Sequence, residues 1–408
     1  MFHTLKSGHN FVLSNSKVLL FCVILATSSQ VFSGEKLAYS VWLRQLKQDA
    51  IDAGISKKTV KATFKDAKLL PKVVQMDRAQ PEFISPFLVY LSRQVTPKKI
   101  EQGRHMLQEY AELLTSTETR YGIPPNILVA FWGMETNYGA HQGDFGLPSS
   151  LMTLAYDGRR ASFFREQLID VMRIVEAGHM PVQSMRGSWA GALGHMQFMP
   201  STMLQHGVDA DSDGKVDLKY SMPDAFASAA NYLRNVGWKK NAPIMLEVRL
   251  PDGFDYAQAQ LTLKRSTDEW TALGVSGFHG EELPKEERAA ILLPQGWQGP
   301  ALMVFANFEV VMDWNRSVNY ALSVAHLAEN LISDTELGGG QEAEIGALSF
   351  NQMWALQMKL NALGYDCGSP DGFPGLKTQN AIRQYQASQQ LPQDGYASPS
   401  LLARLFSD

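Results

Sequence analysis

Apolar residues between Ser40 and about Glu112 recur at the spacing of one helix face, and the first set is Val41, Leu43, Leu46, Ala50 and Ile51. Gly54 follows this set where a helix C-cap is expected. Prolines divide the next stretch into short helices: Pro81, Pro86 and Pro97. A long helix is predicted from about Ile100, and Gly122-Ile-Pro-Pro125 ends it and begins the next. The first part of the chain is therefore predicted to be helical.

The middle of the chain combines helices with one β-like region. Residues 124–235 have the pattern of helices joined by glycine-rich loops. The pattern changes between 243 and 314, because 245–250 alternates roughly and 300–305 is a second short β-like run. A helix is expected again at 320–331. This order predicts a mainly α fold, with an α+β core and a small β-containing subdomain.

The end of the chain divides into a linker and a compact unit. Gly338-Gly-Gly340-Gln-Glu-Ala-Glu is a flexible linker by composition. Residues 349–408 then have their own hydrophobic pattern, with turns at Asp371-Gly372 and Asp394-Gly395. The order helix, turn, helix, turn, helix predicts a small C-terminal three-helix domain.

Composition and charge narrow the class of protein. The chain has 408 residues, of which 45% are hydrophobic and 19% charged, as in ordinary globular proteins of two or three domains. The net charge of −4 gives no basic excess for nucleic acid. It also gives no reason to expect strong attraction to an anionic membrane.

Residues 1–33 have the features of a secretory signal. Lys6 and Lys17 precede the apolar run 18–26, and small and polar residues follow up to Ser33, where we expect cleavage. The alternative is a membrane anchor, but the run is shorter than the roughly 20 residues of a spanning helix. A lipid on Cys22 is not expected, because the bulky Phe21 precedes it. Export to the periplasm is predicted, with no transmembrane span in the mature chain.

One carboxylate stands out in the helical region. Eight uncharged residues, from Ile127 to Met134, lead directly to Glu135. Burial beside such apolar residues disfavours the ionised form of a carboxyl group, so an acid here could donate a proton near neutral pH. Asn137 and Tyr138 would add polar contacts to a substrate. The same pattern also fits a glutamate that only caps or pairs locally.

Three ordered blocks place this carboxylate in a known context: Met134-Glu135-Thr-Asn-Tyr-Gly139, Thr153-Leu-Ala-Tyr-Asp-Gly-Arg-Arg160 and Met185-Arg-Gly-Ser-Trp-Ala-Gly-Ala-Leu-Gly-His-Met-Gln-Phe-Met-Pro-Ser201. With Gln80-Pro-Glu-Phe83, Ala229-Ala-Asn-Tyr-Leu233 and Trp314-Asn-Arg-Ser317, they cover roughly residues 40–333. The chain resembles the membrane-bound lytic transglycosylase B family, which has a lysozyme-like core. The C-terminal unit resembles the small peptidoglycan-binding domain.

The resemblance implies a role for individual residues. Glu135 corresponds to the single acid/base of the family, and four further positions correspond to its substrate-contacting residues: Ser188, Gln197, Tyr232 and Asn315. Some relatives have tyrosine where Trp314 stands, so a hydroxyl role is lost here. His195 is interpreted as a loop residue without a catalytic role.

The implied reaction is a lytic transglycosylation of peptidoglycan glycan strands. Glu135 would protonate the oxygen of the β-1,4 bond between N-acetylmuramic acid and N-acetylglucosamine, and then deprotonate the muramoyl 6-hydroxyl as a 1,6-anhydro ring closes. A lysozyme-type hydrolase normally needs a second carboxylate, and no matching block contains one. That hydrolase and a non-catalytic wall-binding scaffold remain as alternatives.

An acidic loop suggests a metal site. Asp209-Ala-Asp211-Ser-Asp213-Gly214-Lys215-Val-Asp217 matches the first nine positions of an EF-hand loop, with the carbonyl of Lys215 as one ligand. Tyr220 stands at position twelve, where a glutamate is required, and the resemblance suggests that Asp224 closes the site instead. A structural Ca²⁺ and an acidic turn without metal are both possible interpretations. No cofactor is expected to take part in the chemistry.

These patterns give a domain plan for the whole chain. We expect a signal peptide in 1–33, a catalytic domain in 34–336, a linker in 337–348 and a peptidoglycan-binding domain in 349–408. A generic partner-binding module is the alternative for the last unit. Tethering to the cell wall would raise the substrate concentration at the catalytic site.

Overall fold

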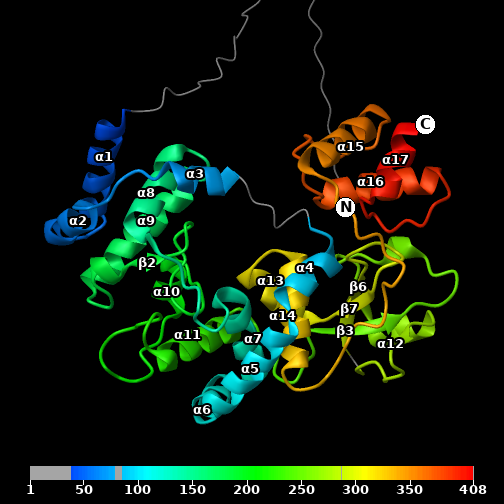
Figure 1. Ribbon diagram of the computed structural model, residues 1–408, viewed down its shortest axis with the longest axis horizontal. Helices are drawn as coiled ribbons and strands as arrows, with labels where there is room; N and C mark the ends of the chain where they lie inside the picture. Colours follow the sequence, from blue (N-terminus) through cyan, green and yellow to red (C-terminus); the bar gives the residue numbers. More distant parts are fainter. Residues whose placement is uncertain (1–37, 79–84, 286, 408) are drawn as a thin grey trace, which may run out of the picture.

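The computed structural model describes residues 38–78, 85–285 and 287–407 (Figure 1). The predicted signal peptide 1–33, including Cys22, lies outside the described residues. So does the block Gln80-Pro-Glu-Phe83. The fold is mainly helical with small antiparallel sheets, as the sequence predicts.

The helices up to the sheet region are, in chain order, α1 (Tyr39–Asp52), α2 (Lys57–Phe64), α3 (Pro71–Arg78), α4 (Phe87–Gln94), α5 (Pro97–Glu109), α6 (Ala111–Tyr121), α7 (Pro125–Thr136), α8 (Leu147–Asp157), α9 (Ala161–Glu176), α10 (Pro200–His206) and α11 (Met222–Asn235). The later helices are α12 (Thr267–Ala272), α13 (Ala306–Trp314), α14 (Val318–Asn330), α15 (Phe350–Ala362), α16 (Leu376–Ser388) and α17 (Pro399–Ser407). The described residues also contain two short 3₁₀ helices, η2 (Val182–Ser184) and η3 (Tyr256–Gln258).

The long helix predicted from about Ile100 is instead two helices, α5 and α6. Thr96 caps α5 by accepting the Lys99 amide at 3.2 Å, and Pro97 occupies the first turn, where its missing N–H costs nothing. The helix breaks at Tyr110, whose ring packs edge-on against Trp132 and Phe226 at centroid distances of 5.6 and 5.9 Å. Tertiary packing of this ring therefore overrides the local helical pattern.

The β-containing subdomain is a five-stranded antiparallel sheet of order β4-β6-β7-β3-β5, beside which α12 lies (Figure 1). Its strands are β3 (Met245–Arg249), β4 (Arg265–Ser266), β5 (Ser276–Gly277), β6 (Arg288–Leu292) and β7 (Ala301–Val304); β1 (Phe145–Gly146) and β2 (Arg186–Gly187) form a separate pair. The two predicted strands pair directly, with Met245 opposite Val304.

The sequence analysis missed β6, which pairs with β7 near the middle of the sheet. Along β6, Ala290 and Leu292 face the main core, whereas Ala289 and Ile291 face a smaller core that contains Trp270. Because both faces are covered, the strand is a continuous apolar run without the alternation of a half-exposed strand.

The C-terminal three-helix domain consists of α15, α16 and α17 around its own core. Each Asp-Gly turn is held by a buried glutamine. The Gln357 Oε1 atom accepts the Asp371 and Gly372 amides at 3.0 and 2.8 Å. Gln386 accepts the Gly395 amide at 2.9 Å and donates to Asp394. The two turns are therefore part of the domain's internal architecture.

The linker differs from the flexible tether that its composition suggests. The Glu247 side chain, which is 7% exposed on β3, accepts the amides of Gly338 and Gly339 at 2.9 and 2.8 Å. Further on, the Gln295 amide donates to the Glu344 carbonyl at 2.8 Å. Because glycine has no side chain, the backbone at 338–339 can lie against Phe278 and Pro300. The linker thus follows the surface of the β-containing subdomain.

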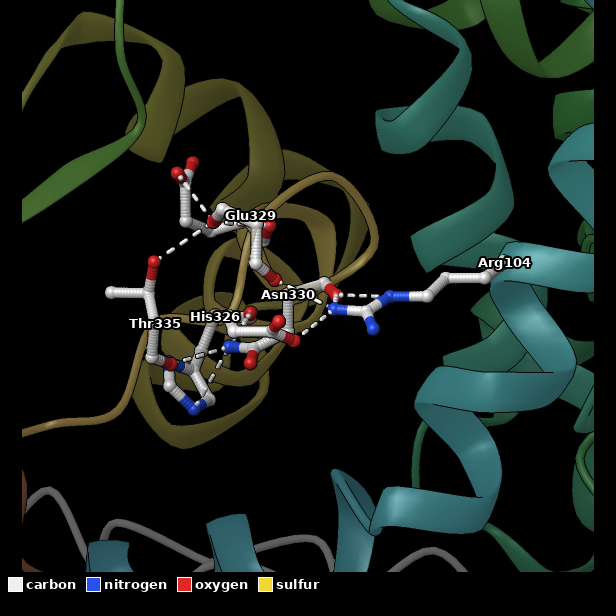
Figure 2. Close-up of polar contacts among 7 residues, drawn as sticks. Arg104, His326, Glu329, Asn330 and Thr335 are labelled. Atoms are coloured by element: carbon white, nitrogen blue, oxygen red, sulfur yellow. Dashed lines mark hydrogen bonds and ion pairs between the residues drawn. The ribbon is translucent and has the colours of Figure 1, made fainter.

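A second anchor fixes the chain where it leaves α14 (Figure 2). From α5, the Arg104 guanidinium donates to the carbonyls of Asn330 and Ser333 at 2.7 Å and to Asp334. The Asn330 amide donates in turn to the carbonyls of His326 and Thr335 at 2.9 Å. Carbonyls at a helix C-terminus lack partners within the helix, so this arginine satisfies groups that would otherwise need water. The end of α14 is held firmly against α5.

None of the helices in the described part of the chain has the length and apolar character required to cross a membrane.

Candidate active site

The helix α7 delivers Glu135 from the core to a partly exposed position. Its buried face includes Leu128, Phe131 and Trp132, and Glu135 is the penultimate residue. The next residue after the helix, Asn137, has a left-handed conformation with φ of 51°. The chain therefore turns away sharply just beyond the carboxylate, which leaves it at the end of an otherwise buried helix.

Two neutral donors converge on one oxygen of Glu135. The Trp314 indole N–H donates to Oε1 at 2.8 Å from the last residue of α13. The Tyr320 hydroxyl donates to the same oxygen at 2.5 Å from the first turn of α14. Trp314 has no hydroxyl group, as expected, but its indole nitrogen gives this position a polar role at the carboxylate.

Sequence reasoning did not identify Tyr320, which lies inside an apolar helix. The side chain is 5% exposed. Burial raises the pKa of Tyr320 well above its ordinary value, and the neighbouring Glu135 carboxylate raises it further. The hydroxyl therefore stays protonated and acts as a donor at neutral pH. Its one local signal is that Tyr320 places a hydroxyl group on a helix face that the hydrophobic pattern assigns to the core.

Aromatic rings hold Trp314 in place. Its ring centroid lies 4.5 Å from that of Phe131, 5.2 Å from Phe198 and 5.1 Å from Tyr232. The Tyr232 hydroxyl donates to the Asp313 carbonyl at 3.0 Å, and burial raises its pKa. Packing of this kind limits the indole to one orientation, so its N–H stays directed at Glu135.

The predicted substrate residues Ser188 and Gln197 lie on one compact loop. Isolated bridges join Gly187 to Leu193 and Leu193 to Phe198. The Ser188 Oγ atom accepts the Ala192 amide at 3.0 Å, so its own proton can be donated elsewhere. Gln197 has φ of 48°, and its amide nitrogen donates to the carbonyls of Gly194 and Gln142 at 3.0 and 3.2 Å. Both side chains are partly exposed.

Two further predicted substrate residues, Asn315 and Tyr138, have different environments. Asn315 is partly exposed directly after Trp314, and its side-chain oxygen accepts the Ser317 amide at 3.2 Å. Tyr138 is 7% exposed, and its hydroxyl donates to the Lys99 carbonyl at 2.8 Å. Its ring fills the space beside Gly103 and Gly133. This is the environment of a structural residue, and it does not support the prediction that Tyr138 contacts substrate.

His195 joins the loop to the end of α7. The Trp132 indole N–H donates to His195 Nδ1 at 3.0 Å, and the Thr136 hydroxyl donates to the His195 carbonyl at 2.9 Å. Burial lowers the pKa of His195, with Asp217 opposing that effect. The imidazole is thus a neutral acceptor that fixes the loop to the end of α7, beside Glu135. The sequence analysis placed His195 in a loop but did not predict this structural contact.

The acidic loop brings three of the predicted metal ligands together. Carboxylate oxygens of Asp209, Asp211 and Asp213 lie within 4.8 Å of one another. Gly214 has φ of 88°, the conformation that favours glycine at the sixth position of such a loop. Oxygen donors grouped in this way fit a hard cation such as Ca²⁺.

Asp217 and Asp224 hold the loop by hydrogen bonds to its backbone. Asp224 is 1% exposed, and its two oxygens accept the Ala210 and Asp217 amides at 2.7 and 2.8 Å. Asp217 accepts the Lys219 and Tyr220 amides, both at 2.9 Å. Neither belongs to the cluster of three carboxylates. Both hold the backbone of the loop, and their ligation of a metal stays a prediction.

Comparisons with known proteins agree with this geometry. A family model described as the transglycosylase SLT domain matches residues 38–329, and one described as a putative peptidoglycan binding domain matches 351–405. Membrane-bound lytic murein transglycosylase B of Escherichia coli (strain K12) is 27% identical over 297 residues, which cover 68% of this chain and 78% of that protein.

Solved structures extend the similarity to almost the whole chain. SltB3 from Pseudomonas aeruginosa, crystallised with NAG-NAM-pentapeptide, is 41% identical with a TM-score of 0.86, covering 90% of this chain and 99% of that one. The Escherichia coli lytic transglycosylase Slt35, crystallised with calcium, is 27% identical with a TM-score of 0.62, covering 71% and 92%.

Proposed function

Since this chain belongs to the transglycosylase SLT domain family and is a lytic transglycosylase that acts on peptidoglycan, we propose that Glu135 is its single acid and base. The observation that carries this proposal is the pair of neutral donors on Oε1. A lysine or arginine in their place would hold the carboxyl group in its ionised form. Neutral donors permit both the protonated and the ionised form, and the proposed reaction needs each in turn.

The first step is protonation of the glycosidic oxygen. Because Oε1 accepts both hydrogen bonds, it is the carbonyl oxygen of the protonated group, and the acidic proton is on Oε2. Glu135 transfers this proton to the oxygen between N-acetylmuramic acid and N-acetylglucosamine. The bond from that oxygen to the muramoyl C1 breaks, and the N-acetylglucosamine leaves with a 4-hydroxyl group. The substrate's own acetamido group stabilises the positive charge that develops at C1.

The second step closes the ring without water. Glu135, now a carboxylate, takes the proton from the muramoyl 6-hydroxyl while the 6-oxygen forms a bond to C1. The acid is thereby regenerated, and the product is a 1,6-anhydromuramoyl end. One group used first as acid and then as base follows from microscopic reversibility.

Residues around Glu135 position the substrate in this proposal. The Ser188 and Gln197 side chains are both partly exposed and suited to the acetamido group. The Ser188 hydroxyl can donate its proton, because its oxygen already accepts the Ala192 amide. The Gln197 side-chain oxygen can accept, because the amide nitrogen already donates to the Gly194 carbonyl. Asn315 and Tyr232 flank Trp314 and contact the neighbouring sugar. Domain bounds of 34–336, 337–348 and 349–408 complete the proposal, with export to the periplasm by the signal in 1–33.

Mass spectrometry of digested sacculi tests the reaction. We expect disaccharide-peptides that are lighter than hydrolysis products by one water, because the 6-hydroxyl replaces water as the nucleophile. Products with a reducing end would instead identify a lysozyme-type hydrolase. The absence of soluble products, with binding to sacculi retained, would indicate a wall-binding scaffold.

We also infer that Asp209, Asp211 and Asp213 bind a structural Ca²⁺, with the Lys215 carbonyl as a further ligand. Support comes from the cluster of three carboxylates and from the crystallisation of the related Slt35 with calcium. The ion would hold the loop that leads into α11, which also carries Tyr232. It takes no part in the chemistry.

Chelation should lower the melting temperature of the protein. A ligand that binds only the native state at about 100 times its Kd contributes roughly 2.7 kcal/mol, which corresponds to a fall in Tm of roughly 3 °C for a chain of this size. Differential scanning calorimetry with and without EGTA measures this shift. Asp213→Asn is the matched control, since it keeps an oxygen for the Lys215 amide at 2.8 Å but weakens the metal site. An equal Tm with and without EGTA in the native sequence would remove the metal from this account.

A further inference from the structure

Two backbone carbonyls hold the side chain of Gln197, the residue suited to the substrate's acetamido group. Its amide nitrogen donates to the Gly194 carbonyl at 3.0 Å and to the Gln142 carbonyl at 3.2 Å, so both of its hydrogens are used. No group in the described part of the chain donates to the side-chain oxygen, and the residue is partly exposed. The amide is therefore fixed with its oxygen available as an acceptor for a ligand.

His195 connects these two carbonyls. It directly follows Gly194 in the chain, and its backbone amide donates to the Leu218 carbonyl at 2.9 Å. Gly194 has φ of 75°, and a Cβ atom there would clash with the same Leu218 oxygen. The backbone at Gly194 thus packs directly against Leu218, which fixes the Gly194 carbonyl. The His195 ring contacts the second residue, since its Nε2 atom lies 3.3 Å from the side-chain amide of Gln142.

The Trp132 indole determines which nitrogen of the His195 ring carries the proton. An indole N–H can only donate, and it donates to Nδ1 at 3.0 Å. Because Nδ1 accepts, the proton of the imidazole is on Nε2, and this N–H points at the Gln142 side chain. The Gln142 side-chain oxygen is buried without a hydrogen-bond partner. A half-turn of the amide gives this oxygen the N–H that it lacks.

We propose that His195 and Gln142 are positioning residues that act through Gln197 on the acetamido group of the substrate. The inference rests on the proposed function, because it assumes a muramoyl residue at Glu135. The pair holds the two carbonyls that bind the Gln197 amide nitrogen. The Gln197 oxygen then accepts the N–H of the acetamido group. This contact fixes the plane of that group, and the acetamido oxygen stays directed at C1, where positive charge develops.

A positioning role of this kind affects kcat more than KM. The acetamido group stabilises charge only as the bond to C1 breaks, so an error in its orientation costs more in the transition state than in the bound complex. A change to the pair should therefore slow turnover while substrate still binds almost normally. General loosening of the fold would not distinguish the two states in this way.

Gln142→Leu tests the pair, because leucine has a similar volume and no hydrogen-bonding group. On soluble glycan strands we expect kcat to fall about tenfold and KM to change less than about twofold. Gln142→Glu should recover most of this kcat, because a carboxylate oxygen accepts from the His195 Nε2–H. Gln48→Leu is the matched control and should leave both constants unchanged, since Gln48 is an exposed glutamine of α1 with a side-chain hydrogen bond to Asp52.

A double variant with Gln197→Ala separates positioning from general structural support. If the pair acts through Gln197, then Gln142→Leu should cause no further loss of kcat once residue 197 is alanine. Losses that multiply in the double variant would overturn the proposal. An unchanged kcat of Gln142→Leu would also overturn it, and so would a Gln142→Glu variant that is as slow as Gln142→Leu.

A second variant keeps the test valid if Gln142→Leu does not fold, which its melting temperature would show. In His195→Asn, the asparagine oxygen can replace Nδ1 as the acceptor for Trp132, while the contact with Gln142 is lost. It should show the same tenfold fall in kcat, and a kcat equal to that of the native enzyme would overturn the proposal. Failure of the proposed function would appear differently, as reducing-end products from the native enzyme or as turnover retained in Glu135→Gln.

Discussion

Glu135→Gln reduces the release of anhydromuropeptides from sacculi by about 10³-fold or more, because general acid–base catalysis alone supplies 10²–10⁴-fold. The amide can accept the hydrogen bonds from Trp314 and Tyr320 at its oxygen, so the local packing is kept. It cannot deliver a proton to the glycosidic oxygen, and it cannot take one from the 6-hydroxyl. The variant therefore loses both steps. Chromatography of the soluble products at equal enzyme concentration measures the effect.

Binding and stability serve as controls for this variant. Co-sedimentation with sacculi should be unchanged, because the C-terminal domain is untouched. The melting temperature should also remain close to that of the native protein. Turnover that survives in Glu135→Gln would refute the assignment of Glu135 as acid and base.

Tyr320→Phe should lower kcat by about 10- to 100-fold with little change in KM. A hydrogen bond to a charged group contributes about 1.5–3 kcal/mol, and each 1.36 kcal/mol corresponds to a tenfold change in rate. The Tyr320 hydroxyl donates to Oε1 more strongly as Glu135 gives up its proton and gains negative charge. Its contribution is therefore larger in the transition state than in the bound complex, which is why kcat falls more than KM rises.

Trp314→Phe provides the comparison for Tyr320→Phe. It also removes one donor to Oε1, but it leaves the hydroxyl in place and keeps an aromatic ring against Phe131. Because both donors act on one oxygen, their effects on kcat should be coupled. The fold-loss of kcat in the double variant should therefore differ from the product of the two single losses. Strict additivity of the two effects on log kcat, or a kcat of Tyr320→Phe equal to that of the native enzyme, would contradict a shared role at Glu135.

The docked C-terminal domain changes how wall binding contributes to catalysis. A flexible tether only raises the concentration of substrate near the enzyme. Here the linker is held by Glu247 at Gly338 and Gly339, and Asp394 accepts the Trp297 amide. These contacts hold the linker and the C-terminal domain against the β-containing subdomain.

The sequence by itself determined the features that depend on neighbours along the chain. The apolar run before Glu135, the spacing of Asp209, Asp211 and Asp213, and the two Asp-Gly turns are local patterns, and each is found in the expected element. The two β-like runs at 245–250 and 300–305 likewise follow from local signals, and each contains a strand. The family blocks then placed Glu135 in its chemical context.

Only the tertiary structure decided which distant groups meet. Tyr320 reaches Glu135 across 185 residues of sequence, and its apolar surroundings gave no sign of a polar partner. Tyr110 divides a helix because of rings contributed by α7 and α11. Gly338 and Gly339 look flexible by composition, yet a buried carboxylate 91 and 92 residues earlier binds their amides. Such contacts depend on the path of the whole chain, and local propensity records only the conformations that each segment can adopt.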